Sequence, residues 1–500
     1  MKKINSKNIL YLFIILLPLL DMSSFIFRNY FNTSFSPSTF IRPIIPTILI
    51  ILIFFKYKFK LKTIIIGSIY VIYSLVHLYV FNKLNYGISY GTINHELQYI
   101  VNYTFLILNL FIFLFVFYKE DTRNITKSVL IANGIYILSI YISIFTNTSS
   151  TTYLEGMGFK GWFESGNSLS TILVLNLFII FTLFNKLENK KKKIKIIAFI
   201  EIILSGIFLI FLLGTRTGLF GFVLVVGAYI FSRIFILFRN HFVNKEKKLK
   251  KKNKLLLIIC SMLIVFIVGL VLYKGSSLLS RRKYLNSLNN AIIDSQTGEP
   301  SHVTGDILKF KEQIEKNEID ETYISKPMQN SITELYNFAN KHNIAGTDRR
   351  TQQLIYNAYL VKNQSNIFYL LFGNGFLNNY GELTLEMEIP AFLFNFGLIG
   401  FILYFIPFLS LFIYYIYIGI KNIKKIDEEY IFLCFGIFLS FILSFLVGQI
   451  FFNSSAMIII TCMNVLLLNK CINLKNKKIN IIDNTNTEQN SLNNEELLVK

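Results

Sequence analysis

Three arginines in polar segments of the sequence have the chemistry of an anion-binding site. Arg216 stands in the run GTRTG, where the flanking glycines allow a ligand to approach the backbone closely. Its planar guanidinium can hold a phosphate through two parallel hydrogen bonds. Arg349 and Arg350 open the helix-like run RRTQQLIYNAYLVKN and would lie beside its positive end. The arginines predict a phosphate site, although an interfacial arginine can also be only an anchor and loop arginines are often only solvated.

Carboxylates gather in front of an apolar run late in the chain. Glu382, Glu386 and Glu388 stand in GELTLEMEIPAFLFNFGLIGF, and Pro390 favours a helix start at this point. A carboxylate at such a low-dielectric position can take up a proton and act as a general base. The alternative is an acidic cap that complements the positive N-terminus of a helix. Both roles stay open for each glutamate.

Residues that bind metals or form disulfides give a weaker signal. His302 and His342 lie in polar sequence without a Cys, Asp or Glu at metal-ligand spacing, so we predict no metal site and no cofactor. Asp21 can be a catalytic acid or a helix cap, and we favour the cap. The four cysteines predict no disulfide framework because they fall in or beside apolar runs: Cys260, Cys434, Cys462 and Cys471.

The composition indicates what must position these residues. Of the 500 residues, 53% are hydrophobic and 16% aromatic, and the mean hydropathy is +0.51. A soluble domain could not bury so much apolar surface, whereas a lipid bilayer accommodates it. The net charge of +21 comes from short basic runs between apolar stretches, a pattern of membrane topology that argues against nucleic acid as a partner. We therefore expect an all-α, polytopic integral membrane protein.

Twelve apolar windows predict about twelve transmembrane helices, because each is close to the ~20 residues that cross a hydrocarbon layer. The windows cover residues 9–27, 39–55, 63–81, 98–118, 126–146, 167–185, 196–213, 218–238, 255–273, 388–418, 430–450 and 452–469. With a cytoplasmic N-terminus, the short inner segments hold 27 Lys and Arg residues and the short outer loops hold four. This asymmetry predicts a protein of the cytoplasmic membrane with both termini in the cytoplasm. The basic runs can also contact anionic lipid.

Two outer connections are unusual. Residues 214–217 form a very short turn between helices seven and eight, with Arg216 at its tip. A long extracytoplasmic loop separates helices nine and ten. Short helices are expected in it, since Ser331 and Glu334 form a capping box and Asp348 can cap the run that follows. The predicted parts of the chain are a membrane domain, the loop, a second membrane part and a mobile cytoplasmic tail, over residues 1–273, 274–387, 388–470 and 471–500.

Four motifs, read in order, resemble the O-antigen ligase and polysaccharide polymerase superfamily of C-type membrane glycosyltransferases. They are GWFESGNSLSTIL at 161–173, LLGTRTGLFG at 212–221, TDRRTQQLIYNAYLVKN followed by LFGNGF, and EMEIPAFLFNFGLIG. The lipopolysaccharide ligases carry a histidine eleven residues before the first glycine of GLIG, and this chain has Glu386 there. The resemblance is therefore to the branch of Gram-positive polysaccharide polymerases, in which Glu386 and Glu388 occupy the corresponding positions.

The resemblance implies transfer of a glycan from a polyprenyl diphosphate to a hydroxyl of an acceptor sugar, at the outer face and without a metal ion. In this scheme Arg216, with Arg349 or Arg350, would bind the diphosphate, with a slight preference for Arg349. Glu386 or Glu388 would be the general base, and Glu386 is preferred.

Two alternatives remain open. The first is a lipid-linked oligosaccharide flippase or another secondary transporter, for which interior ionisable residues such as Glu201 and His77 would be needed. The second is a metal-dependent oligosaccharyltransferase-like enzyme that uses Asp21.

Overall fold

The protein is seen here as a computed structural model in which long apolar helices dominate. The structure describes residues 6–33, 36–56, 61–84, 93–186, 192–242, 277, 279–283, 311–318, 325–342, 344, 348–364, 366–376, 383–448 and 450–498. The elements are α1 Ser6–Asn29, α2 Pro37–Lys56, α3 Leu61–Leu84, α4 Ile93–Val116, α5 Arg123–Phe145, β1 Ser150–Thr151, β2 Phe159–Gly161, α6 Gly166–Lys186, α7 Lys192–Ile207, the π-helical η2 Phe208–Leu212, α8 Arg216–Phe242, α12 Lys326–Lys341, α13 Arg349–Gln364, α14 Ile367–Phe372, α15 Glu388–Tyr404, α16 Ile406–Lys421, α17 Glu428–Leu446 and α18 Ser454–Leu498.

Eleven of the twelve predicted windows correspond to helices in the described part of the chain. Ten helices there are long and apolar enough to cross a membrane, and α15 with α16 makes an eleventh, bent candidate. The ninth window, 255–273, lies outside the described residues. The chain is thus an all-α, multi-pass membrane protein, as its composition predicts.

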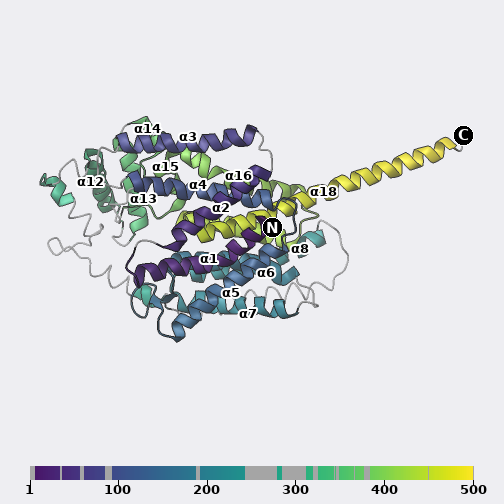
Figure 1. The fold of residues 1–500 in the computed structure, drawn as a ribbon, viewed down its shortest axis with the longest axis horizontal. Coiled ribbons are helices and arrows are strands. Elements are labelled where there is room, and N and C mark those ends of the chain that lie inside the picture. Colours follow the sequence, from purple (N-terminus) through teal and green to yellow (C-terminus); the bar gives the residue numbers. More distant parts are fainter. Residues whose placement is uncertain are drawn as a thin grey trace.

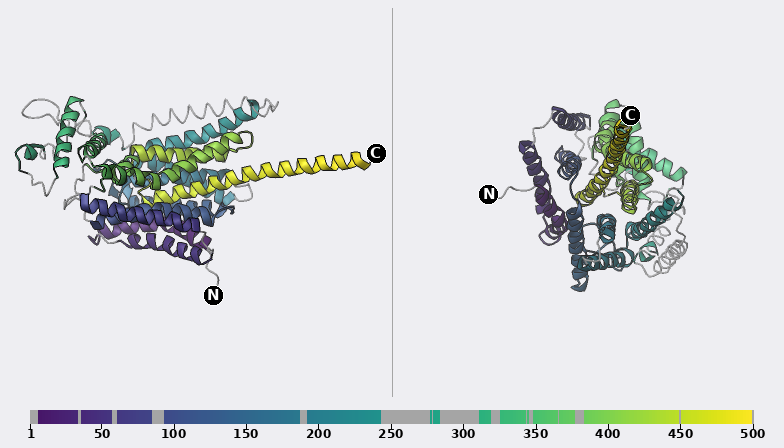
Figure 2. Two further views of the ribbon diagram at one scale, coloured as in Figure 1. Left: turned by 90° about the horizontal axis from the view of Figure 1, so that it is seen from above. Right: turned by 90° about the vertical axis from the view of Figure 1, so that its right-hand side faces the viewer.

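The long helices run side by side along one axis, and α12 and α13 lie beyond one end of the bundle (Figures 1 and 2). We call this the α12–α13 end. Helix α1 begins and α18 ends at the opposite side (Figure 1). The centre of the bundle is formed by α6 and α18, since 83% and 89% of their apolar windows are buried, against 22% for α2 and α3. The charge asymmetry predicts which end of the bundle faces the cytoplasm, and this orientation remains a prediction.

A polar network joins three helices inside the bundle. Asn133 Nδ2 on α5 donates to Glu201 Oε2 on α7 at 3.0 Å, and Asn176 Nδ2 on α6 donates to Asn133 Oδ1 at 3.2 Å. Polar groups away from water must be satisfied by one another, and here they bridge neighbouring helices. Its hydrogen bond to Asn133 gives Glu201 a structural role between helices.

The tenth window is not one continuous helix, contrary to the expectation for residues 388–418. Gly397 has φ 68° inside α15, and α15 and α16 meet at a bend of 43°. A positive φ breaks the helical hydrogen-bond ladder and favours glycine. The turn after α14 occupies the break, since Asn374 N donates to Phe394 O (2.8 Å) and Gly375 N to Asn395 O (3.0 Å). The apolar window could not reveal this break because hydropathy does not report backbone conformation.

A separate layer of α12 and α13 covers one end of the bundle. These helices share an apolar cluster of their own: Met328, Ile332, Leu335, Ala339, Tyr356, Leu360 and Leu383. Asp348 precedes α13 and accepts from Thr351 N, as predicted for a cap, although the distance is 3.4 Å. The predicted capping box is wrong. Helix α12 begins earlier, with Ser325 as N-cap, and Ser331 is buried within it.

The predicted C-terminal tail, residues 471–500, falls largely on the end of α18, and its mobility stays a prediction. Helix α18 continues past its apolar span, Ser454–Asn476, to Leu498 and projects from the bundle (Figure 1). The sequence of this segment is polar. The four domain boundaries remain predictions.

Candidate functional site

The turn that carries Arg216 is held by close backbone packing at the α12–α13 end. Gly214 has φ 74°, and a Cβ there would lie 2.4 Å from Met157 O, so this position accepts no side chain. Thr215 caps α8, because its Oγ1 accepts from Gly218 N at 3.1 Å. Arg216 follows as the first residue of α8 and is exposed. The packing therefore presents the guanidinium at the end of the bundle.

Arg281, which the sequence did not single out, joins this turn from the long loop. Ser277 Oγ donates to Phe211 O at 2.8 Å and so ties the segment to the Arg216 turn. The guanidinium carbon of Arg281 lies 3.7 Å from the ring centroid of Tyr153. Such a cation over an aromatic face is stabilised by the ring quadrupole. Nothing in the local sequence distinguishes Arg281 from its neighbours, because its partner is over a hundred positions away.

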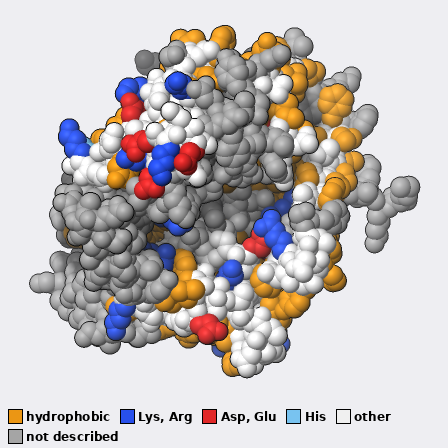
Figure 3. All heavy atoms as spheres, turned by 90° about the vertical axis from the view of Figure 1, so that its left-hand side faces the viewer, with side chains coloured by type: hydrophobic (Ala, Val, Ile, Leu, Met, Phe, Trp, Pro, Cys, Tyr) orange, Lys and Arg blue, Asp and Glu red, His pale blue; other side chains and the backbone are white. Residues whose placement is uncertain are grey.

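The electrostatic surroundings of this contact are mainly cationic. Burial raises the pKa of the Tyr153 phenol. The cations of Arg281, Arg350 and Arg216 lower it, and the carboxylate of Glu386 raises it. Burial lowers the pKa of Arg281, the Tyr153 phenol raises it, and the cations of Arg216 and Arg350 lower it further. Figure 3 looks onto this end, where basic and acidic side chains lie in small groups between apolar ones.

Arg350 and Glu386, both predicted site residues, form an ion pair. Arg350 Nε donates to Glu386 Oε2 at 3.1 Å, and Arg350 Nη1 donates to Leu446 O at 3.0 Å. The side chains are 34% and 50% exposed, so the pair is open to a ligand. Gln353, one turn along α13, accepts from Glu386 N at 3.1 Å. Helix α13 therefore fixes both the backbone and the side chain of Glu386.

Arg349 is placed differently from Arg350. It is the first residue of α13 and is exposed, and the ion pair with Glu386 is made by its neighbour Arg350. Arg350 is thus an arginine that the structure places against the predicted base, whereas the sequence slightly preferred Arg349.

Glu388 is buried and serves as an anchor for the backbone. Its side chain is fully buried, and it accepts hydrogen bonds from three consecutive amides, Ile450 N, Phe451 N and Phe452 N, at 2.5, 2.9 and 2.8 Å. A carboxylate that satisfies three buried N–H groups rigidifies the segment between α17 and α18. Both Glu388 oxygens are engaged, whereas the Glu386 side chain is half-exposed.

The two glutamates therefore differ in backbone as well as in burial. Helix α15 begins at Glu388, and Met387 before it is extended, with φ −74° and ψ 115°. Only Glu388 is helical and turns into the core, whereas Glu386 lies before the helix.

Four further candidates have structural partners or fall outside the described residues. Asp21 lies inside α1 and does not cap it, because its carboxylate pairs with Arg42 and accepts from Tyr136 OH. His342 follows α12, and its ring lies 4.3 Å from that of Phe338. Glu382 and His302 lie outside the described residues.

A buried pair holds the turn of the LFGNGF motif. His77 Nε2 lies 2.6 Å from Glu96 Oε1, both side chains are at most 1% exposed, and His77 Nδ1 bonds Phe372 O at 2.7 Å. Glu96 Oε2 accepts from Phe376 N at 2.7 Å. Both residues thus fasten the turn that fills the break at Gly397. The sequence shows two ionisable residues in apolar helices but not that they meet.

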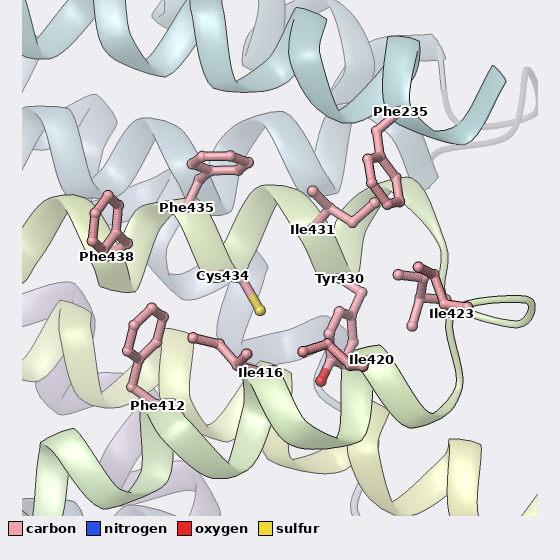
Figure 4. A pocket seen from close by; sticks show the side chains of 12 residues that line it. Phe235, Phe412, Ile416, Ile420, Ile423, Tyr430, Ile431, Cys434, Phe435 and Phe438 are labelled. Carbon is pink, nitrogen blue, oxygen red and sulfur yellow. The ribbon is translucent and has the colours of Figure 1, made fainter. Parts of the chain in front are cut away.

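An apolar cavity lies between α8, α16 and α17, away from this site. Its volume is about 360 Å³, and its wall includes Phe235, Ile416 and Cys434 (Figure 4). None of the predicted site residues lines it. Its chemistry is that of a hydrocarbon-binding space and not of a catalytic centre.

Comparison with known protein families gives a match that covers nearly the whole chain. A family model described as O-antigen ligase like membrane protein matches residues 3–475. No match was found among the curated proteins. Among the residues that the structure describes, no three His, Cys, Asp or Glu side chains are grouped so as to hold a metal ion.

Proposed function

This chain belongs to the O-antigen ligase like membrane protein family, and from that premise we propose that it transfers a glycan from a polyprenyl diphosphate to a hydroxyl of an acceptor sugar. The family supports a membrane enzyme of glycosyl transfer. The finer assignment is that the reaction takes place at the outer face of the cytoplasmic membrane and extends or attaches a cell-surface polysaccharide.

The ion pair of Arg350 and Glu386 is the observation that most directly supports this proposal. The reaction needs a base for the attacking hydroxyl and cations for the leaving diphosphate. A carboxylate and a guanidinium 3.1 Å apart, both partly exposed, meet the two needs side by side. Arg216, at the start of α8, adds a further positive charge, which lowers the pKa of nearby Tyr153.

The proposed step is a single displacement. Glu386 takes the proton of the acceptor hydroxyl through its second oxygen, Oε1, while Oε2 stays with Arg350. The hydroxyl oxygen bonds to the anomeric carbon as the bond from that carbon to the phosphate oxygen breaks. The bonding electrons leave with the polyprenyl diphosphate, whose developing charge the arginine forks stabilise. Glu388 acts through the backbone as a positioning residue.

Cationic side chains take the place that a metal ion has in many diphosphate enzymes, which is the basis for proposing metal independence. A guanidinium matches phosphate oxygens bidentately and stays charged at all physiological pH values. The polyprenyl chain of the donor would lie in the surrounding lipid. This arrangement requires a site at a membrane surface, as at the α12–α13 end.

The transporter alternative has one observation in its favour, the broken helix at Gly397. In transporters such breaks expose helix ends toward a substrate. Here the freed carbonyls are occupied, because Asn374, Gly375 and Tyr73 donate to them. A break filled by protein satisfies the backbone and supports a fixed scaffold more than an ion site.

The proposal is tested with the purified protein in lipid nanodiscs containing EDTA. The donor is the lipid-linked glycan that accumulates in a strain deleted for this chain, and the acceptor is the same glycan freed from lipid. We expect a longer or conjugated glycan and one released polyprenyl diphosphate per bond formed. Donor that crosses liposome membranes without covalent change would establish the transporter instead. Activity that EDTA abolishes and a divalent ion restores would establish the metal-dependent alternative.

A further inference from the structure

Three loops interlock around Tyr153 and Arg281. Gly158, next to the strand β2, lies so close to the Arg216 turn that a Cβ there would be 2.3 Å from Leu213 O. The segment of Arg281 is tied to the same turn through Ser277. Residues 279–283 are helical, and Arg281 is half-buried within them. Its position is therefore set by tertiary contacts and is not that of a mobile surface arginine.

The charges around Arg281 are not balanced among the described residues. Glu386 is the one carboxylate among the charged groups acting most strongly on Tyr153, and it is paired with Arg350. After burial and the Tyr153 phenol, the groups that act most strongly on Arg281 are Arg216 and Arg350, and both are cations. Burial raises the pKa of Tyr153, so this phenol is neutral near pH 7 and adds no negative charge. Clustered cations of this kind raise the local concentration of anions.

We propose that Arg281, its fork held over the Tyr153 ring, is a further ligand of the donor diphosphate, beside Arg216. This inference rests on the proposed function and identifies a binding residue for the same site. The guanidinium has five N–H donors, so its hydrogen bond to the Tyr153 phenol leaves others available for bidentate bonding. Because the ring restricts the side chain before the ligand binds, less conformational entropy is lost on binding.

The competing explanation is that Arg281 only fastens the loop to Tyr153. The two explanations differ in what anion binding requires. If Arg281 only fastened the loop, any side chain that covers the Tyr153 ring would serve. If Arg281 binds the diphosphate, its planar guanidinium is required. Binding of inorganic pyrophosphate, measured at equilibrium by calorimetry on the full chain in nanodiscs, separates them and does not depend on turnover.

The variants are Arg281→Ala and Arg281→Lys, with Lys283→Ala as matched control. Lys283 is exposed and lies in the same helical stretch, so its loss removes one positive charge nearby. We expect Arg281→Ala to weaken pyrophosphate binding and raise the donor KM by about tenfold or more, as for the loss of a charged hydrogen bond. Arg281→Lys should recover only part of this, and Lys283→Ala should stay within about twofold of wild type, because the planar fork and not charge alone is needed.

Three outcomes overturn the inference. They are wild-type pyrophosphate binding in Arg281→Ala, an equal effect of Lys283→Ala, and full recovery in Arg281→Lys. A lower Tm of Arg281→Ala with unchanged pyrophosphate binding would assign Arg281 to the fastener role. If wild type binds pyrophosphate through Arg281 but forms no glycosidic bond, the inference stands and the proposed function fails.

Discussion

Arg350 on α13 and Glu386 before α15 lie 3.1 Å apart, although 36 positions separate them in the chain. The contact joins the α12–α13 layer to the entry of the broken helix. It also places the predicted base beside a cation at the α12–α13 end of the bundle. The predictions below test what each member of this arrangement does.

Glu386→Gln keeps the size of the side chain but cannot take up a proton at neutral pH. We expect the transfer rate to fall by on the order of 10² to 10⁴, with the donor KM changed little. The measurement is in vitro transfer in EDTA. Glu334→Gln is the control, because Glu334 also pairs with a basic residue in the α12–α13 layer, Lys362 at 3.0 Å. Full activity of Glu386→Gln would remove this carboxylate from the chemistry.

Glu388→Gln should act on stability before chemistry. An amide cannot accept all three N–H bonds that the carboxylate accepts, and its own NH₂ would face those donors. We expect a loss of about 2 kcal/mol in unfolding free energy and a smaller fall in transfer than in Glu386→Gln. Thermal unfolding in detergent measures the first effect. A normal Tm with abolished transfer would instead make Glu388 the base.

Arg216→Ala and Arg216→Lys should both lower transfer by on the order of 10²-fold while the protein still inserts in the membrane, because the planar fork is needed and not charge alone. Arg28→Ala is the control. That arginine is exposed and pairs with Glu164 at 3.3 Å. Normal activity of the lysine variant would contradict the fork argument.

Of the two adjacent arginines, Arg350 is expected to matter more than Arg349, since it contacts Glu386. Arg350→Ala should reduce transfer strongly because the base loses its orienting partner. Arg349→Ala should reduce transfer less. The comparison uses the same transfer assay, and the reverse order would restore the preference drawn from the sequence.

Gly397→Ala should destabilise the protein by more than about 2 kcal/mol, because alanine is strained at positive φ. Its Cβ would also lie 2.4 Å from Leu371 C on α14. Gly227→Ala is the matched control in helix α8, since a Cβ there meets nothing within 4 Å. Alanine at Gly227 should be neutral or slightly stabilising. The yield and Tm of folded protein decide, and equal behaviour of the two variants would contradict the account of the break.

The membrane orientation is tested with reporters fused to truncated chains. A reporter after residue 195 or 252 should be cytoplasmic, and one near residue 320 should be external, because of the excess of Lys and Arg in the predicted inner loops. A cytoplasmic reporter at residue 320 would overturn the orientation and place the arginine site on the wrong side for the proposed reaction.

Local properties of the chain were enough to predict eleven of the helices found in the described residues, since a run of ~20 apolar residues suits a bilayer whatever its neighbours are. The order of the motifs was enough to identify the family. The same properties indicated that Arg216, Arg350 and Glu386 are candidates for one site. Each of these inferences depends on residue type and on spacing along a short segment.

The roles of neighbouring residues were decided only by tertiary contacts. Glu386 and Glu388 are two positions apart and equally acidic, yet one pairs with Arg350 and the other is buried against the segment before α18. Arg281 became a candidate only through its contact with the ring of Tyr153, which is distant in the sequence and lies in another loop. Hydropathy and motif patterns describe a chain segment by itself, whereas burial and pairing depend on which distant segments pack against it.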